Sequence, residues 1–159
     1  MSLLMYRAYG VMRGDVVIIR WIAVDGAATE TAVVLVFGAV MVATMRHGVR
    51  APIQWIVRCA LMATIGLAVY ASIAWLIGKA HAGTGSYLAC LRTAGYAIAP
   101  VALGGMSADG MAVGFAVAFI ASTGVLRAVH KMTWSLSALT AVVPLVVVMA
   151  AVASVVARA

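Results

Sequence analysis

The side chains capable of metal or redox chemistry are few in this 159-residue chain and lie far apart. The histidines are His47, His81 and His130, each expected in a separate loop, and the cysteines are Cys59 and Cys90. No two of these residues have the spacing of a zinc motif, and no acid flanks a histidine at ligand distance. The sequence therefore predicts no metal site, and it predicts that both cysteines are small buried apolar residues.

Acid–base chemistry would depend on four carboxylates, those of Asp15, Asp25, Glu30 and Asp109. A proton-coupled transporter usually keeps a carboxylate near the middle of a membrane span. None of the four is expected there, because Asp109 lies in a glycine-rich turn and Glu30 stands at the edge of an apolar run. Glu30 is the one candidate for a coupling residue.

The glycine-rich segment 83–86, with the sequence GTGS, could cradle a phosphate at the start of a helix. It lacks the lysine of a nucleotide-binding loop and does not follow a strand. Ser86 has no histidine and acid at a spacing that would make it a nucleophile, and it is instead expected to cap the following helix. We expect no catalytic residue, no cofactor and no enzymatic activity.

The composition defines the class of protein that must position these residues. Hydrophobic residues make up 66% of the chain and charged residues 9%, with a mean hydropathy of +1.15. A soluble domain has about 45–50% apolar and about 25% charged residues, so a soluble fold and a disordered chain are both excluded. The net charge of +7 comes from scattered arginines, which excludes a nucleic-acid partner. We therefore expect an all-α integral membrane protein.

The apolar runs predict a single membrane domain, 1–159, with five transmembrane helices. A span needs about 20 apolar residues, and the expected spans are 29–46, 53–78, 87–105, 111–127 and 134–157. Residues 1–26 are too polar to cross. They are expected to form an amphipathic segment in the membrane interface, with Trp21 at headgroup level, or a lead-in helix packed on the bundle.

Positive charges predict the orientation of these spans. With the N-terminus inside, seven basic residues face the cytoplasm and four face outside, which favours a cytoplasmic N-terminus. The inner set is Arg7, Arg13, Arg20, Lys79, Arg92, Arg127 and Lys131, and the outer set is Arg46, Arg50, Arg58 and Arg158.

Small residues recur every fourth position in the fourth expected span, at Gly110, Gly114, Ala118 and Ser122. Such a ridge lets helix backbones approach closely, which is how helices associate in lipid. Two interpretations remain open at this point: packing within the bundle, or a seam for a second copy or a foreign helix.

The third expected span carries the most specific pattern, GTGSYLACLRTAGYAIAP over residues 83–100. Arg92 and Tyr96 share a helix face, and Pro100 is expected to kink the helix. They form either an interfacial arginine with an aromatic neighbour or a pocket for a lipid headgroup or partner. The pattern resembles the Yip family of membrane proteins, named for interaction with Ypt/Rab GTPases. The matching residues are Gly85, Ser86, Arg92, Gly95, Tyr96 and Pro100.

This resemblance implies five spans, a cytoplasmic N-terminus and no known catalytic residues. Eukaryotic members act in vesicle traffic and membrane shaping, whereas bacterial members largely lack an assigned function. The excess of arginine over lysine, together with abundant alanine, valine and glycine, indicates a bacterial source of high GC content. We expect a non-enzymatic protein of a bacterial inner membrane that acts by helix packing, as a membrane organiser or an accessory subunit. Its partners would be lipids and other membrane helices or further copies; the alternative is a small oligomeric transporter or channel.

Overall fold

The computed structural model describes residues 2–45, 52–104 and 108–156, and these ranges form helices with no strand among them. The predicted all-α class is confirmed for this part of the chain. The helices are α1 (Leu3–Met12), α2 (Val16–Val24), α3 (Ala28–Met45), α4 (Pro52–Ala80), α5 (Tyr87–Gly104), α6 (Ala108–His130) and α7 (Trp134–Val156). The last five begin and end within three residues of the expected spans.

Two of the described helices are long and apolar enough to cross a membrane alone, at Pro52–Ala80 and Ala112–His130. A third crossing would be the pair Val16–Val24 and Ala28–Val42, which passes the same test together but is bent by 110°. The helix at Trp134–Val148 is apolar but shorter. Length and composition thus support two or three crossings among the described residues, and the expected five are not confirmed.

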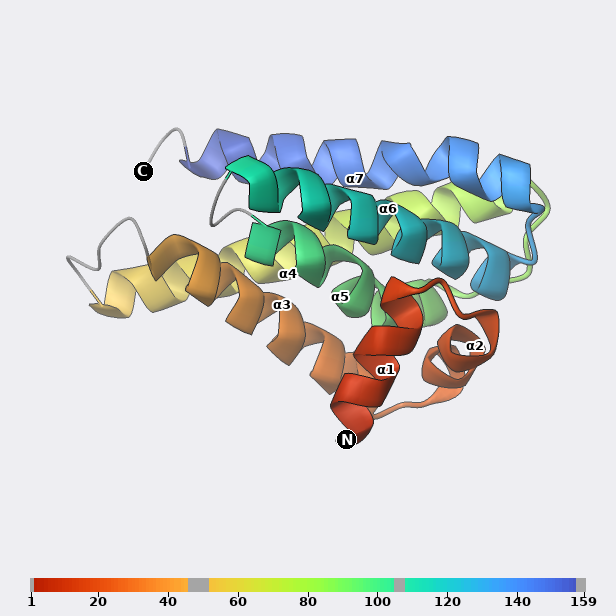
Figure 1. Ribbon diagram of the computed structural model, residues 1–159, viewed down its shortest axis with the longest axis horizontal. Helices are drawn as coiled ribbons and strands as arrows, with labels where there is room; N and C mark the ends of the chain where they lie inside the picture. The colour runs from red at the N-terminus through yellow and green to blue at the C-terminus, as the bar shows by residue number, and fades with distance from the viewer. Residues whose placement is uncertain (1, 46–51, 105–107, 157–159) are drawn as a thin grey trace.

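Helices α3–α7 lie side by side and alternate in direction along the chain (Figure 1). Short connections at one end join α4 to α5 through residues 81–86 and α6 to α7 through residues 131–133. We call this end the basic end, because the helix termini there carry Lys79, Arg92, Arg127 and Lys131. The first turns of α4 and α6 lie at the opposite end, where Arg58 is found.

The N-terminal segment consists of two short helices, α1 and α2, that pack across the flank of α5 and α6 (Figure 1). They are joined at Gly14, whose φ of 68° closes α1 in a Schellman motif. In this motif the Asp15 N–H donates to the Gly10 carbonyl at 2.9 Å. Asp15 then caps α2 by accepting from the Val17 N–H, also at 2.9 Å. We call α1 and α2 the N-terminal helix pair.

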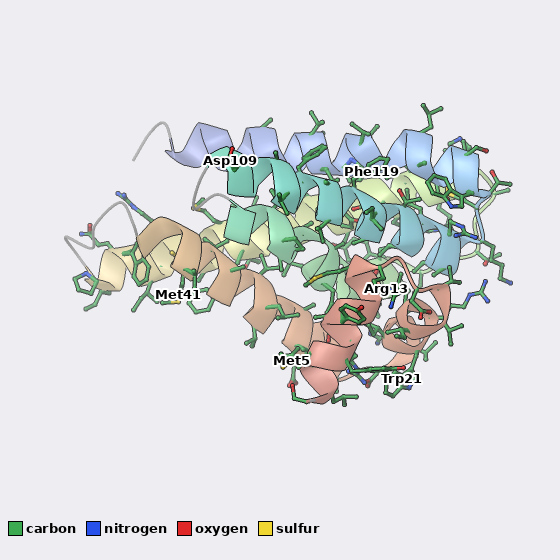
Figure 2. All side chains as sticks on the ribbon, in the orientation of Figure 1. Met5, Arg13, Trp21, Met41, Asp109 and Phe119 are labelled. Carbon is green, nitrogen blue, oxygen red and sulfur yellow. The ribbon has the colours of Figure 1, made fainter. Side chains whose placement is uncertain are left out.

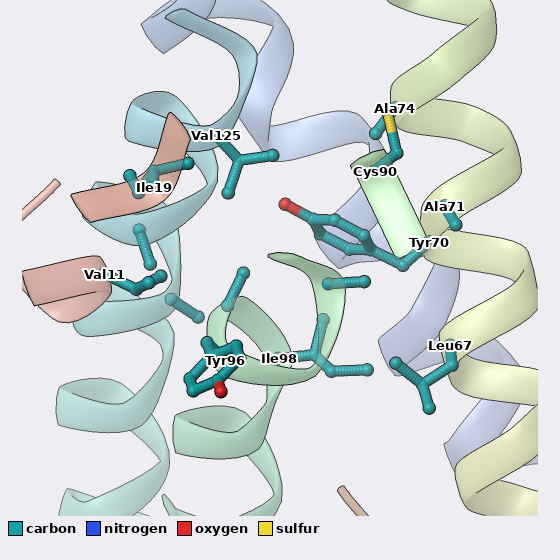
Figure 3. Packing of buried hydrophobic residues seen from close by; sticks show 14 of the residues in the cluster. Val11, Ile19, Leu67, Tyr70, Ala71, Ala74, Cys90, Tyr96, Ile98 and Val125 are labelled. Carbon is teal, nitrogen blue, oxygen red and sulfur yellow. The ribbon is translucent and has the colours of Figure 1, made fainter. Parts of the chain in front are cut away.

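Helix α5 is the centre of the molecule, because it contacts α1, α2, α3, α4 and α6. Its residues from Thr93 to Pro100 are all buried. Around it the core is built from many alanines and fewer large side chains, among them Tyr70, Tyr96, Ile19 and Leu67 (Figure 3). Small residues permit close helix contacts, which stabilise bundles in lipid, where burial from water supplies little.

The closest contact between α5 and α3 is made at Gly95. A Cβ placed there would lie 2.4 Å from the Cα of Ala32 and 2.5 Å from its carbonyl oxygen. Because both atoms belong to backbone, neither can move without shifting a helix. Gly95 of the third-span pattern thus sets the distance between α3 and α5.

We predict that Gly95→Ala lowers the free energy of unfolding by about 1–3 kcal/mol, the usual cost of overpacking a core. Gly38→Ala in α3 is the matched control, because a Cβ at Gly38 meets nothing within 4 Å. That control gains up to about 1 kcal/mol from helix propensity. Thermal unfolding in mild detergent measures both changes, and equal stability of the two variants would contradict the prediction.

Candidate functional site

The sharpest feature of the backbone is the 110° bend between α2 and α3, with Asp25 at its apex. A bend of this kind leaves the last carbonyls of α2 and the first N–H groups of α3 without helical partners. The Asp25 carboxylate accepts from the N–H of Ala27, the residue just before α3, at 3.0 Å and so gives this donor a partner. Its negative charge is also favourable at a helix N-terminus.

Arg7 of α1 supplies the counter-charge at this bend. Its guanidinium forms an ion pair with the second oxygen of Asp25 and lies 4.7 Å over the centroid of the Trp21 ring. The Arg7 side chain is only 7% exposed. A buried cation of this kind requires its anion, so the ion pair fixes α1 against the bend.

Arg92 of α5 approaches the same bend from the bundle side. Its Nη1 donates to the Ala23 carbonyl at the end of α2, at 2.9 Å, and its Nε donates to the Thr29 hydroxyl at 3.3 Å. One side chain therefore caps α2 and contacts the first turn of α3. We call Arg7, Asp25, Thr29 and Arg92 the corner.

Tyr96, one turn after Arg92, lies behind the corner and is 1% exposed. Its hydroxyl lacks a hydrogen bond of good geometry but is close enough to Arg7 to interact electrostatically. Pro100 is buried as well, within α5, which continues to Gly104. Of the three residues considered as lining a pocket, Tyr96 and Pro100 are thus buried in the bundle, whereas Arg92 is half-buried at the corner.

The corner also sets the protonation of Asp25. The hydrogen bond from Arg7, followed by that from the Ala27 N–H and by the charges of Arg7 and Arg92, holds the pKa of Asp25 below its ordinary value. A carboxyl with a lowered pKa stabilises the fold while it is ionised. That contribution is complete above the unfolded pKa of about 4 and is lost as the pH falls through the lower folded value.

A second cluster of polar groups lies at the basic end, around His130. The sequence placed His130 in a loop, but it is the last residue of α6 and only 3% exposed. Its Nε2 lies 3.2 Å from Cys90 Sγ, and its Nδ1 has no hydrogen-bond partner. The prediction was wrong because a polar residue next to Lys131 is typical of a surface loop, whereas α6 continues for three residues beyond Arg127.

Three glycines make room for the His130 ring. A Cβ at Gly78 would lie 2.0 Å from Nδ1, and one at Gly83 or Gly85 would lie 2.8 Å from the same atom. Gly85 of the third-span pattern is thus part of a cradle for a side chain 45 positions further along the chain. The cluster of glycines around this short loop is visible in the sequence, but their spacing does not identify the side chain that they enclose.

Ser86 caps α5 as expected, with its hydroxyl accepting from the Ala89 N–H at 3.2 Å. His81 lies exposed at the end of α4, and His47 lies outside the described residues. Among the residues that the structure describes, no group of three or more potential metal ligands comes together.

The small-residue ridge of α6 faces the interior of this chain's own bundle along most of its length. Gly114, Ala118 and Ser122 are buried, and Gly110 is half-buried. Ser122 accepts a hydrogen bond from the hydroxyl of Tyr70 in α4, at 2.8 Å. This placement favours packing within the bundle over a seam between chains.

We predict that Asp25→Asn lowers the unfolding midpoint at pH 7, because it leaves the buried guanidinium of Arg7 without a counter-ion. The variant should also lose less stability than the wild type between pH 5 and pH 3, since the titrating group is gone. Thermal unfolding in mild detergent across this pH range measures both effects. Asp109→Asn, which changes an exposed carboxylate at the opposite end, is the control and should show the wild-type dependence of the unfolding midpoint on pH. A wild-type dependence on pH in Asp25→Asn would contradict the prediction.

Comparison with known proteins identifies the family to which the chain belongs. The model of the Yip1 domain matches residues 9–155, a range that includes the turn at Gly14, the bend at Asp25 and all of the third-span pattern. No functionally curated protein and no solved structure matches the chain. Because the match covers nearly the whole sequence, the chain belongs to the Yip family of membrane proteins.

Proposed function

We propose that the chain is a non-enzymatic, multi-pass protein of a bacterial inner membrane, in which α3–α7 each cross the bilayer. It acts through helix packing, as a membrane organiser or as a small accessory subunit of a larger complex. The observation that carries this proposal is the apolar outer surface of the bundle.

Large apolar side chains point outward from α3, α4, α6 and α7. A folded protein in water rarely leaves so many of them uncovered, whereas a lipid-facing surface requires them. They include Val33, Val34, Ile53, Val57, Leu61, Ile65, Leu76, Val113, Ile120, Leu139, Val143 and Val146.

Each of the five helices also contains a threonine whose hydroxyl donates to the carbonyl four residues earlier. These bonds measure 2.8–3.2 Å and belong to Thr31, Thr64, Thr93, Thr123 and Thr140. Within hydrocarbon a polar group must find its partner inside the protein. The pattern supports five crossings, although α5 and α7 are less apolar or shorter than α4.

The acidic residues argue against the alternative of an ion-coupled transporter. Asp15 and Asp25 cap α2, while Glu30 and Asp109 lie in the first turns of α3 and α6. All four carboxylates of the chain are therefore at helix ends rather than at mid-span. Glu30 is exposed at the start of α3, next to the corner.

Labelling of engineered cysteines tests the crossings and their direction. With Cys59 and Cys90 replaced by alanine, Thr84→Cys places a thiol at the basic end and Asp109→Cys places one at the opposite end, both at exposed positions. We expect an impermeant maleimide to label Asp109→Cys in intact spheroplasts and Thr84→Cys only after permeabilisation. Labelling of both positions from the same side would contradict five crossings.

Purification tests whether the chain acts as an organiser or accessory subunit rather than as a transporter. Extraction in mild detergent followed by native mass spectrometry is expected to give the chain in a fixed ratio with another membrane protein or with retained lipid. Liposomes containing it should show no uptake or conductance above background. A pure homo-oligomer whose conductance is lost in Glu30→Gln or Arg92→Gln would instead establish the transporter; Gln54→Ala, an exposed change at the other end, is the control.

A further inference from the structure

The N-terminal helix pair is apolar on the side that faces away from the bundle. While Ile18, Ile19 and Ile22 of α2 are buried against the bundle, Val17, Trp21 and Val24 are exposed by 76%, 46% and 77%. These three recur at the spacing of one helix face. Met5 and Tyr9 add exposed apolar surface on α1, and Figure 2 places Met5 and Trp21 at the outer edge of the molecule. We call Met5, Tyr9, Val17, Trp21 and Val24 the outer face.

The outer face lies across the direction of the bundle. Because α2 meets α3 at 110°, it runs close to the plane of the membrane if α3 crosses it. The corner prevents this angle from relaxing, since Arg92 binds the end of α2 and Arg7 binds Asp25. The turn of the pair is seated on α6, where a Cβ at Gly124 would lie 2.7 Å from the Cα of Gly14. The pair is thus tied by these contacts to the bend, to α5 and to α6.

Cations border the outer face. Arg13 and Arg20 are both exposed. Arg13 lies over the ring of Tyr9, 5.3 Å from its centroid, and donates to its hydroxyl at 3.3 Å. Arg20 is anchored by a bond of 3.3 Å from Nε to the Ala128 carbonyl. The nearby carboxylate of Asp15 is engaged by the N–H groups of Val17 and Ile18.

From these contacts we propose that the outer face is seated in the headgroup layer of a single leaflet and that Arg13 and Arg20 bind the phosphates of anionic phospholipids there. Aromatic and apolar side chains beside arginines are suited to this layer, where one end of each side chain is apolar and the other is wet. The excess of exposed cations complements an anionic surface rather than a neutral one. The proposal rests on the membrane crossing proposed above, in which the basic end is the cytoplasmic side.

The depth of Trp21 in the bilayer tests whether the outer face is seated in the headgroup layer. The full chain with Trp55, Trp75 and Trp134 changed to phenylalanine is reconstituted into vesicles that contain about 30% phosphatidylglycerol, enough to give an anionic surface. We expect lipids brominated near the glycerol to quench Trp21 more strongly than lipids brominated near the chain end, and aqueous iodide to quench it weakly. Strong quenching by iodide, with none by brominated lipid, would overturn the proposal.

A second variant distinguishes failure of this proposal from failure of the proposed membrane crossing. A chain in which Trp55 of α4 is the sole tryptophan reports on the bundle at the opposite end. Quenching of Trp55 by brominated lipid together with failure at Trp21 would leave the crossing intact and refute only the seating of the helix pair. If Trp21 is shielded from both quenchers in native membranes, a protein covers the outer face and the lipid proposal is wrong.

The preference of the chain for anionic lipid tests whether Arg13 and Arg20 bind phospholipid phosphates. We measure the competition between phosphatidylglycerol and phosphatidylcholine for the Trp21 environment, using one of the two lipids in brominated form. Each arginine near an anionic surface contributes about a fivefold preference, so Arg13→Gln and Arg20→Gln should each lower the preference by up to about fivefold. Arg58→Gln, an exposed arginine at the other end, should leave it unchanged, and an equal loss in all three variants would overturn the assignment.

Discussion

The structure depends on how the chain satisfies its backbone at the bend between α2 and α3. A helix that stops leaves carbonyl and N–H groups without helical partners, and side chains that supply those partners stabilise the bend. Arg92 and Asp25 supply those partners, and Arg7 balances the charge that Asp25 brings. Since Arg7 belongs to α1 and Arg92 to α5, the same contacts that permit the bend also position the first helix and the central one.

Close backbone contact is the second requirement, and it is met by glycine at separate places. Gly95 lets α5 touch α3, Gly14 and Gly124 let the N-terminal helix pair touch α6, and three glycines at and around the α4–α5 connection surround His130. In a membrane, helices gain little by leaving lipid for one another, so the gain comes from contact at short range. The structure is therefore most sensitive where a methyl group has no space.

The sequence predicted the helices well and their partners poorly. Long apolar runs and the cap at Ser86 are local properties, so the bounds of α3–α7 could be placed to within a few residues. The corner could not be predicted, because Arg7 and Asp25 are 18 positions apart and neither carries a motif. Arg92 was singled out by its pattern, but whether it faced lipid or protein depended on where α2 and α3 lie. His130 was misplaced for the same reason, because the glycines that enclose it form no pattern that identifies the enclosed side chain.

The N-terminal helix pair has a geometric consequence for the membrane around it. Lying across the bundle near one end, it adds cross-section there and none at the other end (Figure 1). A molecule with this outline is tapered, and when the wider end is embedded in one leaflet it displaces more lipid on that side. The free energy of such an inclusion is lowest where that leaflet is the outer surface of a curve. Because the corner makes the taper rigid, it is a fixed shape that the surrounding bilayer has to accommodate.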